Sequence, residues 1–175
     1  METTKKQETV AKTECQQLKE SGFSGFVTIR QLMNDIRLAP AQKGVYVILR
    51  KSSSTPVTFI ANGTGGFFKG KNPNVKIEQL EKDFLPDAQI LYIGKAGGAS
   101  LKATLQSRLS QYMQFGQGLP IGHWGGRYIW QIQEARDLLV CWKPLVTEEP
   151  REVEKKMIAK FKETYGKRPF ANLRN

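Results

Sequence analysis

The chain is poor in the residues that build metal clusters and disulfide frameworks. Its 175 residues include two cysteines and one histidine. Cys15 and Cys141 lie far apart and form no CxxC motif, which argues against both a disulfide framework and a zinc knuckle. His123 alone cannot supply the paired histidines of the common zinc motifs. We therefore expect a reducing compartment, the cytoplasm.

Long apolar runs are also missing. The first 20 residues are polar and charged, and no stretch elsewhere approaches the roughly 20 apolar residues of a membrane span. The sequence thus predicts no signal peptide and no membrane association. With 39% apolar residues, the chain can bury one core but is too short for two full domains. We expect one domain over residues 41–175, with a polar segment and helix over residues 1–40 packed on it.

Acidic residues are scarce relative to basic ones. Lys and Arg total 27 against 16 Asp and Glu, a formal net charge of +11, which favours a polyanionic partner. Residues 50–76 contain no acidic side chain. The candidate nucleic-acid contacts in and around that stretch are Lys51, Lys69, Lys71 and Lys76. The alternative is an interaction protein whose charge only maintains solubility.

Hydrophobic spacing predicts the helices, and runs of β-branched and aromatic residues predict the strands. The predicted helices cover residues 28–35, 101–115 and 150–165, with a short polar helix near residues 11–20. The predicted strands cover residues 44–50, 89–93, 128–132 and 138–142. Between the first two strands, residues 51–87 form a long insertion rich in Gly, Ser and Pro, with a candidate hairpin that pairs residues 57–61 with 67–69.

Two tripeptides stand at corresponding places in the first two predicted strands. They are Gly44-Val45-Tyr46 and Tyr92-Ile93-Gly94. Downstream, the two longest predicted helices carry Arg108 and Glu154 beside their apolar faces, and Asn172 follows the last helix. The order is therefore two tyrosines on strands, an arginine and a glutamate on helices, and an asparagine in a final loop.

This set resembles the catalytic core of the GIY-YIG nucleases over residues 44–174. The resemblance implies an α/β fold with a small central antiparallel sheet flanked by helices. It also implies a divalent-metal-dependent endonuclease that hydrolyses phosphodiester bonds in DNA, with RNA as the other candidate substrate. The insertion of residues 51–87 departs from the short hairpin usual in that family, and we expect it to act as a basic arm that binds substrate.

The resemblance also implies roles for individual residues. Tyr46 would be the general base, and Tyr92 would orient water or phosphate. Arg108 would neutralise the charge that develops on phosphate, because its planar fork suits that anion. Glu154 would hold one Mg²⁺ or Mn²⁺ ion, and Asn172 would orient the site.

Three other positions are secondary. A free phenol is only about 0.1% ionised at neutral pH, so Tyr46 needs a cationic neighbour, for which Lys95 is the candidate. Tyr112, one turn after Arg108, is either a site residue or part of the core. Trp124 belongs to a glycine-rich loop around His123, and this loop is either a structural turn or a substrate contact.

The sequence raises two further alternatives. The first is a nucleic-acid-binding module that keeps the fold without turnover. The second, a phosphate-binding P-loop, is disfavoured, because the GxxxxGK pattern that ends at Lys71 continues with Asn72 and Pro73 in place of a hydroxyl and a helix.

Overall fold

A four-stranded antiparallel sheet organises the chain. The structure, a computed structural model, describes residues 10–173. The strands are β1 (Ser24–Thr28), β2 (Gly44–Leu49), β3 (Ile90–Ala96) and β4 (Leu139–Pro144), in the order β1-β4-β2-β3. The expected α/β class with a small antiparallel sheet is confirmed. The strand β3 lies at one edge, next to β2 alone.

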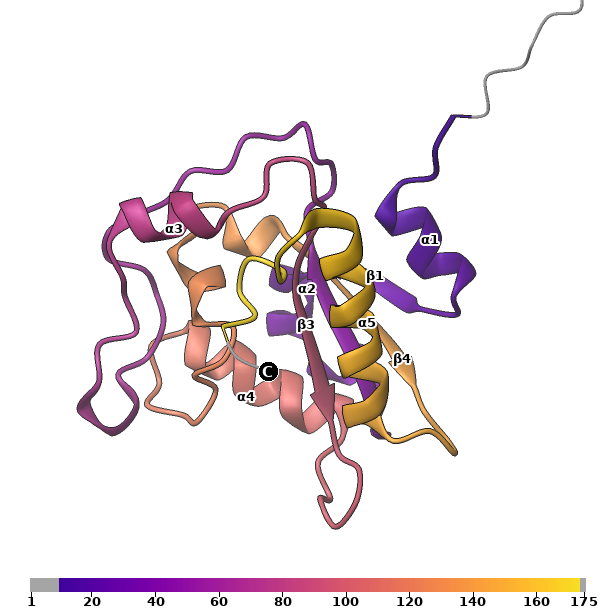
Figure 1. The fold of residues 1–175 in the computed structure, drawn as a ribbon. Coiled ribbons are helices and arrows are strands. Elements are labelled where there is room, and N and C mark those ends of the chain that lie inside the picture. The colour runs from indigo at the N-terminus through magenta and orange to yellow at the C-terminus, as the bar shows by residue number, and fades with distance from the viewer. Residues whose placement is uncertain (1–9, 174–175) are drawn as a thin grey trace, which may run out of the picture.

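Helices cover both faces of the sheet. Figure 1 shows α1 (Glu14–Glu20) and α5 (Pro150–Tyr165) on one side, and α2 (Ile29–Asn34) and α4 (Leu105–Gly116) on the other. All six residues of β2 are buried, and they alternate between the two layers. Among residues 10–173, no helix is both long enough and apolar enough to span a bilayer.

Local sequence signals explain where the helices begin and end. Thr28 and Thr104 each accept a hydrogen bond from a backbone N–H in the first turn and complete a capping box. Gly166 adopts a left-handed φ of 79° and ends α5, as glycine does at helix C-termini. The predicted helices of residues 28–35 and 150–165 are confirmed. The helix predicted from residue 101 begins only at Leu105, because Thr104 caps it.

Two predicted elements are wrong. The strand predicted over residues 128–132 is a 3₁₀ helix, Arg127–Gln131. The hairpin predicted inside the insertion does not form, because Phe59 instead pairs with Ile132. The sequence analysis also missed β1 and a short helix of the insertion, α3 (Ile77–Asp83).

The insertion packs on the core along much of its length. The Gln131 side chain donates hydrogen bonds to three of its carbonyl groups, those of Ile60, Ala61 and Val75. The Phe59 ring also stacks on Phe170 from the segment after α5, with ring centroids 5.5 Å apart. Figure 1 places α3 and the middle of the insertion on the opposite side of the molecule from α1. The insertion therefore packs against the core and does not project from it as an arm. Its expected part in substrate binding stays a prediction.

Arg50 fastens both ends of the insertion. Its side chain is 3% exposed, and its guanidinium donates hydrogen bonds to carbonyl groups at the start and end of the segment. These acceptors are Ser53, Thr55, Pro86 and Ala88. Burial lowers the pKa of Arg50. Because arginine stays protonated in proteins, the backbone carbonyl dipoles solvate a full positive charge.

We expect Arg50→Met to destabilise the fold by roughly 3 kcal/mol, because it leaves several buried carbonyl groups without a donor. Urea denaturation gives the free energy of unfolding, and limited proteolysis should show earlier cutting within residues 51–87. Arg37→Met is the control, since Arg37 is exposed and forms a surface ion pair with Asp35; its free energy of unfolding should stay close to that of the wild type. Equal losses in the two variants would contradict the anchoring role.

Candidate active site

Three tyrosines from different elements meet on the α4 side of the sheet. Tyr46 comes from β2, Tyr92 from β3 and Tyr112 from α4. The ring centroids of Tyr46 and Tyr92 are 6.0 Å apart, and those of Tyr92 and Tyr112 are 5.6 Å apart. The β2 and β3 register places Tyr46 opposite Gly94. A Cβ atom at Gly94 would lie 2.3 Å from the Tyr46 ring, so this glycine makes room for the phenol.

His123 completes the tyrosine cluster. Its Nε2 lies 3.1 Å from the Tyr46 hydroxyl, and its Nδ1 lies 3.0 Å from the Gly125 carbonyl oxygen. Because a carbonyl only accepts, Nδ1 carries the proton and Nε2 accepts from Tyr46. The imidazole also stacks on Tyr112 at a centroid distance of 4.1 Å. From the sequence, this loop is either a structural turn or a substrate contact, because a lone histidine between glycines is the only signal of its role.

Burial keeps these side chains neutral. It raises the pKa of Tyr46 and Tyr112 well above that of a free phenol, and that of Tyr92 to about 12. Burial, followed by the charge of Arg108, lowers the pKa of His123 to about 3. At neutral pH the cluster therefore holds three phenols and a neutral imidazole, none of them charged.

Arg108 lies beside the cluster on α4. Its Nη1 donates to the Gln111 side chain at 3.0 Å and to the Gly122 carbonyl at 3.3 Å. The positive charge of Arg108 opposes the rise in the pKa of both Tyr46 and Tyr92. The guanidinium is half-buried and engaged, so it would have to exchange these partners to bind a phosphate.

Glu154 approaches from the other side of the sheet, on α5. Burial raises the pKa of its carboxyl group, while the charges of Lys95, Arg151 and Arg108 oppose that rise. Lys95 is half-buried on β3, opposite Val45. The structure thus brings Lys95 and Arg108 into the electrostatic environment of Glu154, although the three come from different elements.

Asn172 pairs with the edge of the sheet. Its Oδ1 accepts from the Ile93 N–H at 2.9 Å, and its Nδ2 donates to the Ile93 carbonyl at 2.8 Å. One residue earlier, the Ala171 N–H donates to the Leu91 carbonyl at 2.8 Å. The Asn172 amide therefore satisfies the free backbone groups of β3 directly after Tyr92, in place of a further strand.

A cleft of about 890 Å³ opens along this edge of β3. Tyr92, Glu154 and Asn172 all line it, whereas Tyr46 and Tyr112 are fully buried and do not. Its walls come from the insertion, the loop after α4, the C-terminal half of α5 and the segment that follows. The basic residues among its lining are Lys71, Arg127, Lys162, Lys167 and Arg168.

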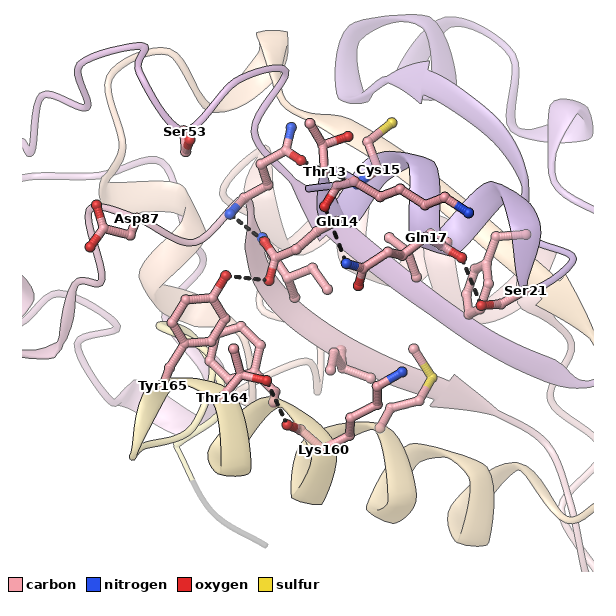
Figure 2. Close-up of a pocket in the computed structure, with 18 of the residues that line it drawn as sticks. Thr13, Glu14, Cys15, Gln17, Ser21, Ser53, Asp87, Lys160, Thr164 and Tyr165 are labelled. Carbon is pink, nitrogen blue, oxygen red and sulfur yellow. Dashed lines mark hydrogen bonds between the residues drawn. The ribbon is translucent and has the colours of Figure 1, made fainter. Parts of the chain in front are cut away.

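The basic residues predicted in and around the insertion do not converge on this cleft. Lys71 lines it, while Lys69 and Lys76 are exposed outside it. Lys51 instead borders a second groove of about 630 Å³ between α1 and α5. Figure 2 shows this second groove, where Glu14 accepts a hydrogen bond from the Tyr165 hydroxyl at 2.9 Å.

The donor set for a cation is small. Within residues 10–173, no group of three or more His, Cys, Asp or Glu side chains could hold a metal ion. The Asn172 oxygen is already occupied by a backbone N–H. The carboxylates that line the cleft are Glu154 and Asp83. Even Glu154 alone fits Mg²⁺, which binds through one or two carboxylates and keeps water and phosphate oxygens as its other ligands.

Comparisons of the chain with protein-family models, with curated proteins and with solved structures found no match. The arrangement of these side chains is therefore the basis on which a function is assigned.

Proposed function

We propose that the protein is a divalent-metal-dependent endonuclease that hydrolyses phosphodiester bonds in DNA, of restriction or repair type, on a GIY-YIG-like arrangement. One observation carries the proposal. Tyr92 and Glu154 line the same basic cleft, the Tyr46 ring contacts the Tyr92 ring, and the charge of Arg108 acts on the pKa of Tyr46, Tyr92 and Glu154. Residues far apart in the sequence thus meet where a polyanion would bind. The free thiols of Cys15 and Cys141 suit a cytoplasmic setting.

Each residue has a defined part in phosphodiester hydrolysis. Arg108 would leave Gln111 and Gly122 to donate two N–H groups to the scissile phosphate. Glu154 would hold one Mg²⁺ or Mn²⁺ ion, which supplies Lewis-acid activation of water and phosphate. Lys95, whose charge acts on Glu154, would offset negative charge near that carboxylate.

The two motif tyrosines differ in access to substrate. Tyr92 is 8% exposed and lines the cleft. Tyr46 is 0% exposed, and its hydroxyl donates a hydrogen bond to His123. A phenol with a pKa of about 12, as Tyr92 has, is a hydrogen-bond donor and a poor base at neutral pH. We therefore assign Tyr92 to donate to phosphate or water, and Tyr46 to hold the cluster in place.

The alternative function is a nucleic-acid-binding module without turnover. Both functions need the basic cleft, but only hydrolysis needs Glu154 as a carboxylate. Incubation of the purified protein with supercoiled plasmid, with and without Mg²⁺, separates them. The nuclease nicks the plasmid only with the ion, and the binding module shifts the plasmid on a gel without nicking it.

We expect Glu154→Gln to abolish nicking while DNA affinity in chelator stays within about twofold, because the amide keeps the size but not the metal-holding charge. The matched control is Glu163→Gln on the exposed side of α5, which should nick at the wild-type rate. Plasmid nicking and fluorescence anisotropy give the two readouts. Undiminished Mg²⁺-dependent nicking by Glu154→Gln would remove Glu154 from the reaction.

Acid should inactivate the enzyme at a higher pH than an ordinary glutamate would require. Burial raises the pKa of Glu154, so its carboxylate is lost as the pH falls through that raised value. Lys95→Met removes a charge that opposes the rise, and we expect it to raise the pKa further. NMR titration of the metal-free protein measures this shift, with Lys155→Met as the control. An unchanged Glu154 titration in Lys95→Met would exclude the coupling.

The tyrosines give an asymmetric pair of variants. Tyr92→Phe should reduce the single-turnover cleavage rate by roughly a hundredfold, since it removes the hydroxyl that reaches the cleft. Tyr46→Phe should lose roughly 1 kcal/mol of stability, from the broken bond to His123, and keep most of the rate. The opposite order of rates would make Tyr46 the general base, reached through movement of the His123 loop.

A further inference from the structure

We propose that the cleft binds an unpaired nucleic-acid strand, with one base stacked on Trp124. The inference rests on the proposed function, because it takes the cleft beside Tyr92 and Glu154 as the substrate site. It adds the structural class of the substrate, a single strand or a displaced strand, which the catalytic residues alone do not specify.

Trp124 differs from the other tryptophans. Trp130 and Trp142 are 1% and 5% exposed in the core, whereas Trp124 is half-exposed and lines the cleft. The Arg127 guanidinium lies 4.6 Å from its ring centroid, and Arg127 Nη1 also donates to the Trp124 carbonyl at 3.3 Å. The Arg127 cation and the core, against which Trp124 also packs, therefore hold the indole in one orientation at the cleft.

The charges around this ring suit a phosphate backbone. Lys71 of the insertion lies in one wall, and Lys162 and Arg168 lie in the wall made by α5 and the segment after it. Lys167 ties the two walls together, because its Nζ donates to the Lys82 carbonyl at 2.8 Å. A cationic groove with an aromatic ring in its wall is the pattern that proteins use to bind single strands without reading their sequence.

The depth of the cleft argues against an intact duplex. Tyr92 is only 8% exposed, so a phosphate must enter between the walls to reach it. A volume of about 890 Å³ lies within the range of small-molecule sites, about 300–1,000 Å³, which a few nucleotides can fill. A duplex is stiff over about 50 nm, and its bases are already paired and stacked, so they are not available to Trp124.

Binding in chelator tests the inference without catalysis. Anisotropy of a labelled 12-nucleotide poly-dT strand is compared with that of a duplex of the same length. We expect the single strand to bind more tightly. Trp124→Ala should weaken its binding roughly 5-fold to 150-fold, the equivalent of one stacked base at about 1–3 kcal/mol. Duplex binding should change less than twofold.

Two further variants make the result specific. Phe67→Ala removes an exposed aromatic ring, 54% accessible, that lies outside the cleft, and it should leave single-strand affinity unchanged. Trp124→Phe keeps a ring for folding and stacking. Its intrinsic fluorescence should lose most of the quenching that poly-dT causes in the wild-type protein, because the other two tryptophans are buried.

The outcomes separate this inference from the nuclease proposal. Equal affinity for both DNA forms, or single-strand binding that Trp124→Ala leaves intact, overturns the inference even when plasmid nicking depends on Glu154. Trp124-dependent single-strand binding without nicking supports the inference and rejects the nuclease. If Trp124→Ala does not fold, quenching by poly-dT that persists in full in Trp124→Phe overturns the stacking role.

Discussion

The pairing of β2 with β3 is the constraint on which the rest of the site depends. Their antiparallel register sets Tyr46 against Gly94 and brings both motif tripeptides into adjacent strands at the edge of the sheet. A slip of one residue would send the Tyr46 ring to the α5 face and end its contact with Tyr112. Because Gly94 has no side chain, the Tyr46 phenol can cross the space over β3 and meet His123.

Burying this many polar groups requires that each one has a partner. The Tyr46 hydroxyl donates to His123, and the Tyr112 hydroxyl donates to the Gly126 carbonyl at 2.7 Å. Both acceptors belong to the glycine-rich loop after α4, so that loop holds the cluster in one arrangement. The same loop covers Tyr46, so solvent does not reach its hydroxyl. The Tyr46 hydroxyl is thus preorganised, and of the three tyrosines in the cluster Tyr92 is the one that lines the cleft.

The sequence predicted those features that are decided within one element. Capping by Thr28 and closure by Gly166 are local, and the periodicity of α5 is visible in its own residues. The 3₁₀ helix of residues 127–131 resembled a strand in sequence because its apolar residues are buried, but they pack on other parts of the core: Trp130 on Tyr112 of α4, and Tyr128 on Phe170. His123 was equally hidden, since its partner Tyr46 is far away in the chain and only the folded loop joins them.

The insertion changes what the sheet edge can bind. Without it, the cleft beside Tyr92 and Glu154 would lack one of its walls. With Asp83 and Lys71 in place as a wall, and with Arg50 fixing both ends of the segment, the edge becomes the floor of a cleft. Burial then raises the pKa of Glu154, and the surrounding cations limit that rise. These cations are Lys95 of β3, Arg151 of α5 and Arg108 of α4, so the insertion supplies a wall of the cleft while the sheet and its helices supply the charges around the carboxylate.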